Sequence, residues 1–104
     1  MEIDNAAEQF RLLARAWAEA DGEALRAEKL EKVVFSELVN QSNDGSVAKA
    51  EHSARAHSRY KDAVDRLVNS RTAANIARAE MDAMKLRVEI WRSRNATKRA
   101  EMQL

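Results

Sequence analysis

Apolar and small side chains recur along the first 38 residues of the chain at a spacing that alternates between three and four. In an α-helix this spacing gathers them on one face and leaves the other faces polar. One charged residue, Glu31, interrupts the series, which otherwise consists of Ile3, Ala6, Phe10, Leu13, Trp17, Ala20, Ala24, Ala27, Val34 and Leu38. The pattern predicts one long amphipathic helix over about residues 4–41.

Gly22 is the weak point of this predicted helix, because glycine in a helix interior costs about 1 kcal/mol relative to alanine. Asp21, directly before it, is a residue type that caps helices, so the pair offers a break. The apolar spacing keeps its phase from Trp17 through Ala24. We therefore favour one continuous helix over two shorter ones.

A polar stretch at residues 40–46, Asn-Gln-Ser-Asn-Asp-Gly-Ser, separates this series from a second one. These residue types favour turns, and we expect the turn at residues 42–45 with Ser46 as the cap of the next helix. The second series contains no Pro or Gly and consists of Val47, Ala50, Ala54, His57, Tyr60, Val64, Leu67, Arg71, Ala74, Ala77, Met81, Met84, Val88 and Trp91. It predicts an uninterrupted second helix over about residues 46–102.

Folding the chain back at the predicted turn brings the two series face to face in an antiparallel hairpin. Large side chains then meet small ones, as with Phe10 opposite Ala77, which interdigitated packing requires. In this register Ile3 lies opposite Met84, so residues 86–104 have no partner within the hairpin. The predicted fold is all-α: a single-domain, coiled-coil-like helical hairpin whose C-terminal helix is the longer one.

The composition implies a thin core. Of the 104 residues, 20 are Ala and only five are aromatic. A small, elongated chain buries proportionally little surface, and so small a core seldom stabilises a monomer. We therefore expect a homo-oligomer, assembled as a helical bundle.

Several features favour a cytoplasmic protein without a membrane partner. The chain contains no Cys, and residues 1–9 lack the basic-then-apolar order of a signal peptide. Its apolar runs are far shorter than the roughly 18 residues that a membrane span needs.

The sequence lacks the residue patterns of catalysis and of cofactor binding. His52 and His57 are five residues apart, which places them about 140° from each other on a helix, and no acid at ligand spacing accompanies them. We expect no catalytic residues, no metal site, no cofactor and no enzymatic activity. His57 lies level with Glu31 in the predicted register, where a buried polar pair would fix the alignment of the helices.

Arg71 is expected opposite Trp17 in the same register. Two interpretations stay open for this pair. The guanidinium either makes a cation–π contact with the indole ring, or packs only its stem and extends its head into water.

Charge divides the chain at Gly45. Residues 1–45 hold ten acids and five bases, a net charge of −5, whereas residues 46–104 hold seven acids and thirteen bases, a net charge of +6. Attraction between an acidic and a basic helix explains this division, and so does a basic surface that binds an anion. The bases are densest around Trp91 in the unpartnered end, where only Glu89 and Glu101 oppose Lys85, Arg87, Arg92, Arg94, Lys98 and Arg99.

A basic helix with an interleaved aromatic residue is typical of single-stranded nucleic-acid binding. The cations neutralise phosphates and the ring stacks on a base. The same end also suits an oligomer interface in which apolar side chains cover those of a second chain, namely Leu86, Val88, Trp91 and Met102. The two interpretations are compatible, because a closed oligomer would gather several basic helices.

A sequence resemblance covers part of the second helix. Ala74, Asn75, Ala77, Ala79, Glu80, Arg87 and Glu89, with the run Trp-Arg-Ser-Arg-Asn-Ala-Thr-Lys-Arg-Ala-Glu-Met from Trp91 to Met102, resemble the C-terminal part of small helical proteins encoded by bacteriophages. In plan, the hairpin is similar to the recombination mediator of T-even phages, an oligomer that binds single-stranded DNA and loads a recombinase. These resemblances imply a phage or prophage origin, the host cytoplasm as location, and a phage or host recombination protein as partner.

Together these features favour a non-enzymatic phage accessory protein that oligomerises and binds single-stranded DNA or RNA, in DNA recombination or replication. The alternative is a protein–protein interaction module, a structural or regulatory coiled coil with no nucleic-acid role. Charge reversal at Arg92 and Arg94 separates the two, because only the first needs their charge. A membrane-surface amphipathic helix is a weaker third interpretation, since Trp91 is the only large aromatic on that face.

Overall fold

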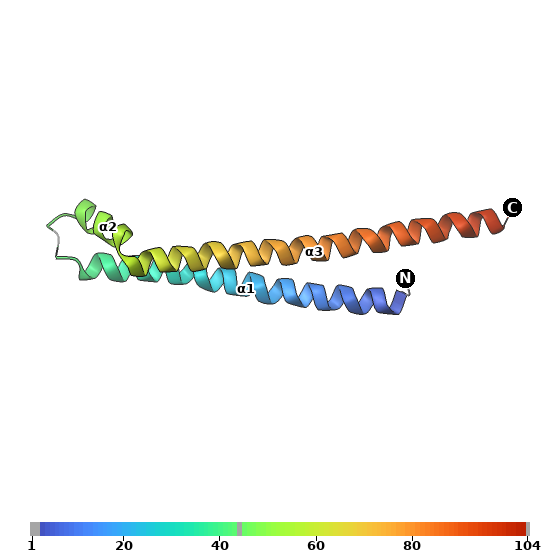
Figure 1. Cartoon of the computed structure of the whole chain (residues 1–104), viewed down its shortest axis with the longest axis horizontal. Coiled ribbons are helices and arrows are strands. Elements are labelled where there is room, and N and C mark those ends of the chain that lie inside the picture. Colours follow the sequence, from blue (N-terminus) through green and yellow to red (C-terminus); the bar gives the residue numbers. More distant parts are fainter. Residues whose placement is uncertain (1–2, 44, 104) are drawn as a thin grey trace.

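The computed structural model describes residues 3–43 and 45–103. These ranges form three helices: α1 (Ile3–Gln41), α2 (Val47–Ala56) and α3 (Ser58–Met102). α1 and α3 run antiparallel and side by side, and α2 lies obliquely at the end where the chain turns (Figure 1). The protein is an all-helical, elongated hairpin with dimensions of 83 × 20 × 14 Å. Asp44, within the turn expected at 42–45, lies outside the described residues.

α1 is a single helix of 39 residues that passes through Asp21 and Gly22 without a break. The backbone of Gly22 has a negative φ, as a helical residue requires. Packing of one face of α1 along its length outweighs the low helix propensity of this glycine. The continuous helix that the apolar spacing favoured is the one observed.

The second half of the hairpin is two helices, so the uninterrupted helix expected over residues 46–102 is wrong. Ser46 caps α2, because its Oγ accepts a hydrogen bond from the backbone N–H of Lys49 at 3.2 Å. α2 ends before His57, whose backbone is extended, with φ −72° and ψ 138°. The His57 Nδ1 accepts a hydrogen bond from the N–H of Arg59 at 3.0 Å, so this side chain caps α3.

Contacts with α1 explain why the chain breaks at a place without Gly or Pro. Directly after the break, Arg59 forms an ion pair with Glu37, and the Tyr60 hydroxyl donates a hydrogen bond to Glu31 Oε1 at 2.8 Å. The Tyr60 ring also packs against Phe35, with 5.6 Å between the ring centroids. These tertiary contacts offset the helical hydrogen bonds lost at the break.

His57 is exposed and does not pair with Glu31, so the buried pair expected between them is wrong. Glu31 accepts its hydrogen bond from Tyr60 instead. This hydrogen bond raises the pKa of Tyr60 above its ordinary value, because the carboxylate favours the protonated hydroxyl, and burial adds to the effect.

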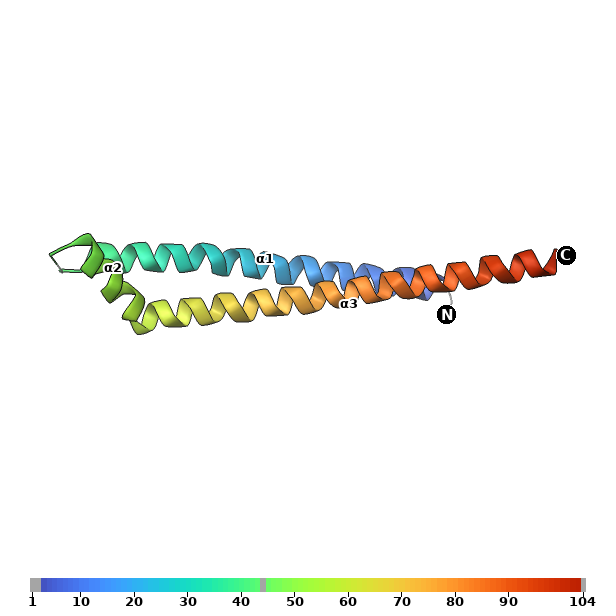
Figure 2. The ribbon, with the colours of Figure 1, turned by 90° about the horizontal axis from the view of Figure 1, so that it is seen from above.

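The oblique path of α2 also changes the register of the hairpin. Its ten residues advance less along α1 than they would in a straight helix, so α1 meets later residues of α3 (Figure 2). The guanidinium of Arg78 lies over the Trp17 ring, 5.9 Å from its centroid, and Arg71 forms an ion pair with Asp21 at 2.9 Å. The predicted register, which placed Arg71 opposite Trp17, is therefore wrong by about two helical turns.

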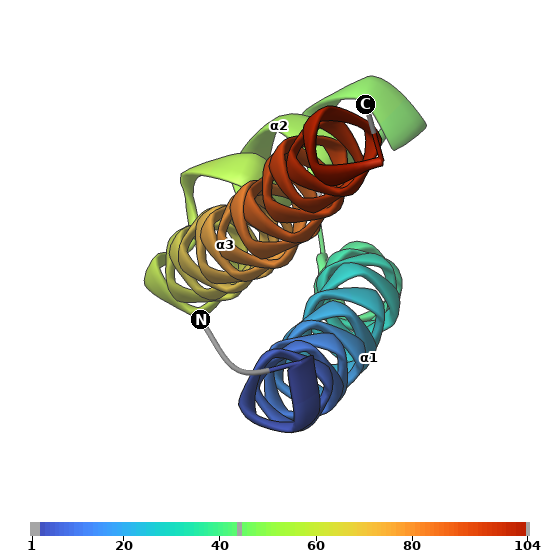
Figure 3. The ribbon, with the colours of Figure 1, turned by 90° about the vertical axis from the view of Figure 1, so that its right-hand side faces the viewer.

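The core between the helices is narrow and rich in Ala. Viewed along the long axis, α1 and α3 lie next to each other as two separate rods (Figure 3). Among the described residues, the buried side chains are Ala6, Ala24, Ala27, Val34, Leu38, Ala50, Ala54, Ala63, Ala74 and Met84, and none is polar. The core is thickest near the turn, where Phe35, Val39 and Tyr60 pack against a cluster of four of these residues.

Candidate nucleic-acid interface

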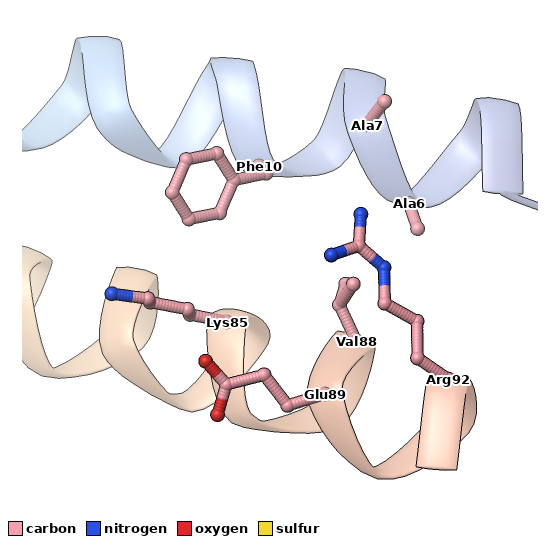
Figure 4. A pocket seen from close by; sticks show the side chains of 7 residues that line it. All are labelled: Ala6, Ala7, Phe10, Lys85, Val88, Glu89 and Arg92. Atoms are coloured by element: carbon pink, nitrogen blue, oxygen red, sulfur yellow. The ribbon is translucent and has the colours of Figure 1, made fainter. Parts of the chain in front are cut away.

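α3 continues past the N-terminal end of α1 (Figure 1). Close to this end, the two helices face each other across an open depression of about 350 Å³, lined by Ala6, Ala7 and Phe10 of α1 and by Lys85, Val88, Glu89 and Arg92 of α3 (Figure 4). Residues 93–102, which we call the projecting end, lie beyond it. The unpartnered segment expected from residue 86 is thus shorter, and residue 104 lies outside the described residues.

The projecting end continues the line of side chains with which α3 faces α1. At the alternating spacing of Met84 and Val88, this line goes on through Trp91, Asn95, Lys98 and Met102. Trp91 and Asn95 are half-buried, whereas the other two are exposed, Met102 to 87%. The apolar seam of the hairpin therefore becomes polar and basic where α1 ends.

The six predicted cations do not form one cluster, because the helix distributes them over two sides of this line. Lys85, Arg92 and Arg99 are seven residues apart and share one side, with Lys85 and Arg92 placed beside the end of α1 (Figure 4). Arg87 and Arg94 lie along the other side. Lys98 occupies the line itself.

These six cations have no ion-pair partner in the described part of the chain, as is also true of Lys29, Lys32, Lys49, Lys61 and Arg66. Seven arginines elsewhere do pair with acids, as Arg11 does with Glu8 and Arg15 with Glu19 along α1. The Arg11 guanidinium lowers the pKa of Glu8 through a hydrogen bond and through its charge. Among the described side chains, no carboxylate forms an ion pair with Lys85, Arg87, Arg92, Arg94, Lys98 or Arg99.

Trp91 is accessible from the projecting end. It lines a wide, shallow depression along α3 together with Ser93, Arg94, Asn95, Thr97, Lys98 and Glu101. Two side chains of this segment bond to their own helix: Thr97 Oγ1 donates to the Ser93 carbonyl at 3.1 Å, and Arg99 Nε to the Asn95 carbonyl at 3.4 Å. The indole ring thus lies beside cations on a surface open to a ligand.

The four residues predicted as an oligomer interface lie in different places. Val88 and Trp91 belong to the line that faces α1, and both are half-buried. Leu86 is 57% exposed on another side of α3, with Ile76 and Ile90. Sequence reasoning missed this grouping, although the spacing of these apolar residues was its visible signal.

The described residues contain no group of three metal-ligating side chains, and none of their helices is long and apolar enough to cross a membrane. Comparison with protein-family models, with curated proteins and with solved structures finds no match to the chain. The resemblance to phage-encoded proteins stays a prediction.

Proposed function

We propose that this chain is a non-enzymatic, self-associating protein that binds single-stranded nucleic acid on the face formed by Trp91, Arg92, Lys98 and Arg99. The supporting observation is a half-buried indole that shares an open surface with Lys98, at the place where α1 stops covering α3. Lys98, Arg92 and Arg99 form no ion pair among the described side chains. Cations without partners need no ion pair broken before they contact a phosphate.

Single-stranded nucleic acid fits this face better than a duplex. An aromatic side chain stacks on a base only when that base is free of its neighbours, and such stacking contributes about 1–3 kcal/mol per base. The charge of the backbone supplies the rest, so affinity should fall steeply as salt rises. A function in phage DNA recombination or replication, in the host cytoplasm, is part of this proposal and depends on the resemblance alone.

Fluorescence anisotropy of a labelled oligothymidine tests the proposal. Arg92→Glu with Arg99→Glu should weaken binding at least tenfold and reduce the slope of log affinity against log salt by about 1.4, the value for two lost phosphate contacts to a single strand. The control is Lys29→Glu with Lys32→Glu, which changes the net charge equally at exposed positions of α1 and should leave most binding intact. Equal loss in both variants would indicate a dependence on net charge and overturn the assigned face.

Trp91 gives a second test. Trp91→Ala should weaken binding by about 1–3 kcal/mol, whereas Trp91→Phe, which keeps a ring, should recover part of the loss. Absence of binding by the wild-type protein at low salt would overturn the proposal as a whole.

One observation favours the alternative function, a protein-interaction module without a nucleic-acid role. Leu86 and Ile90 are exposed apolar residues on α3, as a docking helix requires. This alternative predicts that the binding of a protein partner depends on the apolar residues of α3. Charge reversal at Arg92 and Arg94 should then have little effect on that binding.

A further inference from the structure

A second line of uncharged side chains runs along α3, and we call it the outer stripe. Its spacing alternates between three and four through Ile76, Ala79, Ala83, Leu86, Ile90 and Ser93, and it continues in this way to Ala100. Every one of these side chains is exposed, Ile76 to 56%, Leu86 to 57% and Ile90 to 44%. The outer stripe has the pattern of a packing surface.

The outer stripe lies on the side of α3 away from α1. Leu86 and Ile90 each come two positions after a residue of the line that faces α1, Met84 and Val88. At about 100° per residue, two positions correspond to about 200° around the helix, which is nearly the opposite side. α1 therefore leaves the whole outer stripe uncovered.

Between residues 82 and 94, the two edges of the outer stripe carry opposite charges, whereas Glu80 and Glu101 lie outside this range on the same edge as Arg87 and Arg94. Asp82 and Glu89 precede Ala83 and Ile90 on one edge, whereas Arg87 and Arg94 follow Leu86 and Ser93 on the other. Of these four, only Asp82 has an ion-pair partner among the described side chains, Arg78 at the long distance of 4.0 Å. The edges thus hold charges that are free to pair with another molecule.

We propose that the outer stripe binds a second copy of this chain, with the two α3 helices parallel and in register. In such a pair, each residue on the acidic edge faces the residue five positions further on along the basic edge of the other helix. Asp82 then faces Arg87 of the second copy, and Glu89 faces Arg94. Two-fold symmetry repeats both contacts.

The charges between residues 82 and 94 also disfavour the opposite orientation. In an antiparallel pair, equivalent edges face each other, so the acidic edges with Asp82 and Glu89 would meet and repel. Each exposed ion pair contributes little to stability, but the difference in sign between the two orientations decides which forms.

The apolar residues favour the same arrangement. In register, each residue of the outer stripe packs against its own equivalent. In heptad notation, Ile76 and Ile90 occupy a positions and Leu86 occupies a d position. Isoleucine at a with leucine at d favours two-stranded parallel coiled coils. The contact would extend over residues 76–100, about 36 Å, with each α1 on the outer side of its own α3.

This interface does not depend on nucleic-acid binding. If both occur, Arg94 pairs with Glu89 and leaves Arg92, Lys98 and Arg99 for phosphates. The two projecting ends would then lie side by side and bind one strand twice, which raises affinity through effective concentration.

Light scattering on the full chain measures the association directly. A dimer should have twice the chain mass of 11.8 kDa. Leu86→Glu should yield monomers of unchanged helicity, because this exposed side chain does not support the hairpin core. Leu12→Glu, at a 51% exposed position of α1, should remain dimeric. A monomeric wild-type protein, or equal dissociation in both variants, would overturn the proposal.

Charge swaps test the paired edges. Arg87→Glu with Arg94→Glu should raise the dimer dissociation constant at least tenfold at low salt. Adding Asp82→Arg and Glu89→Arg to this variant restores opposite edges and should restore association. Failure of that rescue would show that the edges do not pair as proposed.

Disulfide cross-linking tests the orientation, since the chain has no Cys of its own. Ala79→Cys and Ser93→Cys, made separately, should each form a symmetric disulfide, because each position meets its equivalent in a parallel pair. An antiparallel pair brings at most one of these positions close to its equivalent, so cross-linking at only one would overturn the parallel arrangement. Monomers that bind oligothymidine would contradict this inference, and with it the self-association in the proposed function, but not the proposed nucleic-acid binding. Dimers that do not bind oligothymidine would contradict the nucleic-acid binding alone.

Discussion

At the turn end of the hairpin, Phe35 and Tyr60 cover buried side chains and Arg55 lies over the Phe35 ring, 5.2 Å from its centroid. At the opposite end, Ala6 and Phe10 meet α3 across an open depression, and then α1 stops. Both ends use the same alternating spacing, but the size and polarity of the side chains differ. The turn end therefore stabilises the fold, while at the other end the side chains of α3 are left uncovered.

The largest effect should come from the cluster at the turn end. Val34→Ala removes two buried methyl groups from a side chain that is 4% exposed, and we expect a loss of about 2 kcal/mol in the free energy of unfolding. The adjacent Val33 is 50% exposed, so Val33→Ala should cost well under half as much. Urea denaturation at one fixed protein concentration compares them, and equal losses would contradict a stabilising cluster.

Tyr60→Phe should have the next largest effect, a loss of about 1 kcal/mol in the free energy of unfolding. Glu31 would stay between the helices but would lose its hydrogen-bond donor. The ring contact with Phe35 is retained, so the measured loss reports the hydroxyl. An unchanged urea midpoint would mean that water replaces the hydroxyl without cost.

The same hydrogen bond makes the free energy of unfolding vary with pH in the alkaline range. Folding raises the pKa of Tyr60, so its contribution is complete below the ordinary tyrosine pKa of about 10 and is lost as pH rises through the higher value of the folded state. The wild-type free energy of unfolding should thus fall more steeply across this range than that of Tyr60→Phe. Parallel curves for the two proteins would contradict the linkage.

Gly22→Ala, midway between the two ends, should stabilise the protein by somewhat less than 1 kcal/mol. The added Cβ would lie 3.8 Å from the nearest guanidinium atom of Arg26, an ordinary contact. Ala18→Gly, at an exposed position of the same helix, should lower stability by a similar amount. Thermal unfolding measures both, and a destabilised Gly22→Ala would point to a need for glycine at this position.

The smallest effect is expected at the projecting end. Met102 is 87% exposed, so Met102→Ala should change the free energy of unfolding by less than about 0.5 kcal/mol. A larger loss, independent of protein concentration, would show that this end supports the fold and would weaken the contrast between the two ends.

The helices themselves were predictable, because the spacing of apolar residues is a local property of the sequence. The break at His57 was not, since no Gly or Pro marks it and its causes are contacts of Arg59 and Tyr60 with α1. Register errors followed from the same source: a straight second helix placed Arg71 at Trp17, whereas the structure has Arg78 there.

The candidate site was predictable in composition but not in arrangement. Counting charges identified six cations near Trp91. Which of these cations α1 leaves uncovered depends on where α1 ends along α3. That position is set by the register of the two helices. The outer stripe needed both the spacing of Ile76, Leu86 and Ile90 and the knowledge of which side α1 occupies.

The hydrogen bond between Tyr60 and Glu31 has a consequence for the uniqueness of the folded state. Helices that pack mainly through Ala resemble themselves after a shift of seven residues, so sliding along one another costs little in packing. A shift of this size would place Glu31 at Leu67, whose own side chain offers no hydrogen-bond donor. One polar contact in an alanine-rich seam thus excludes alternative alignments that packing alone would tolerate.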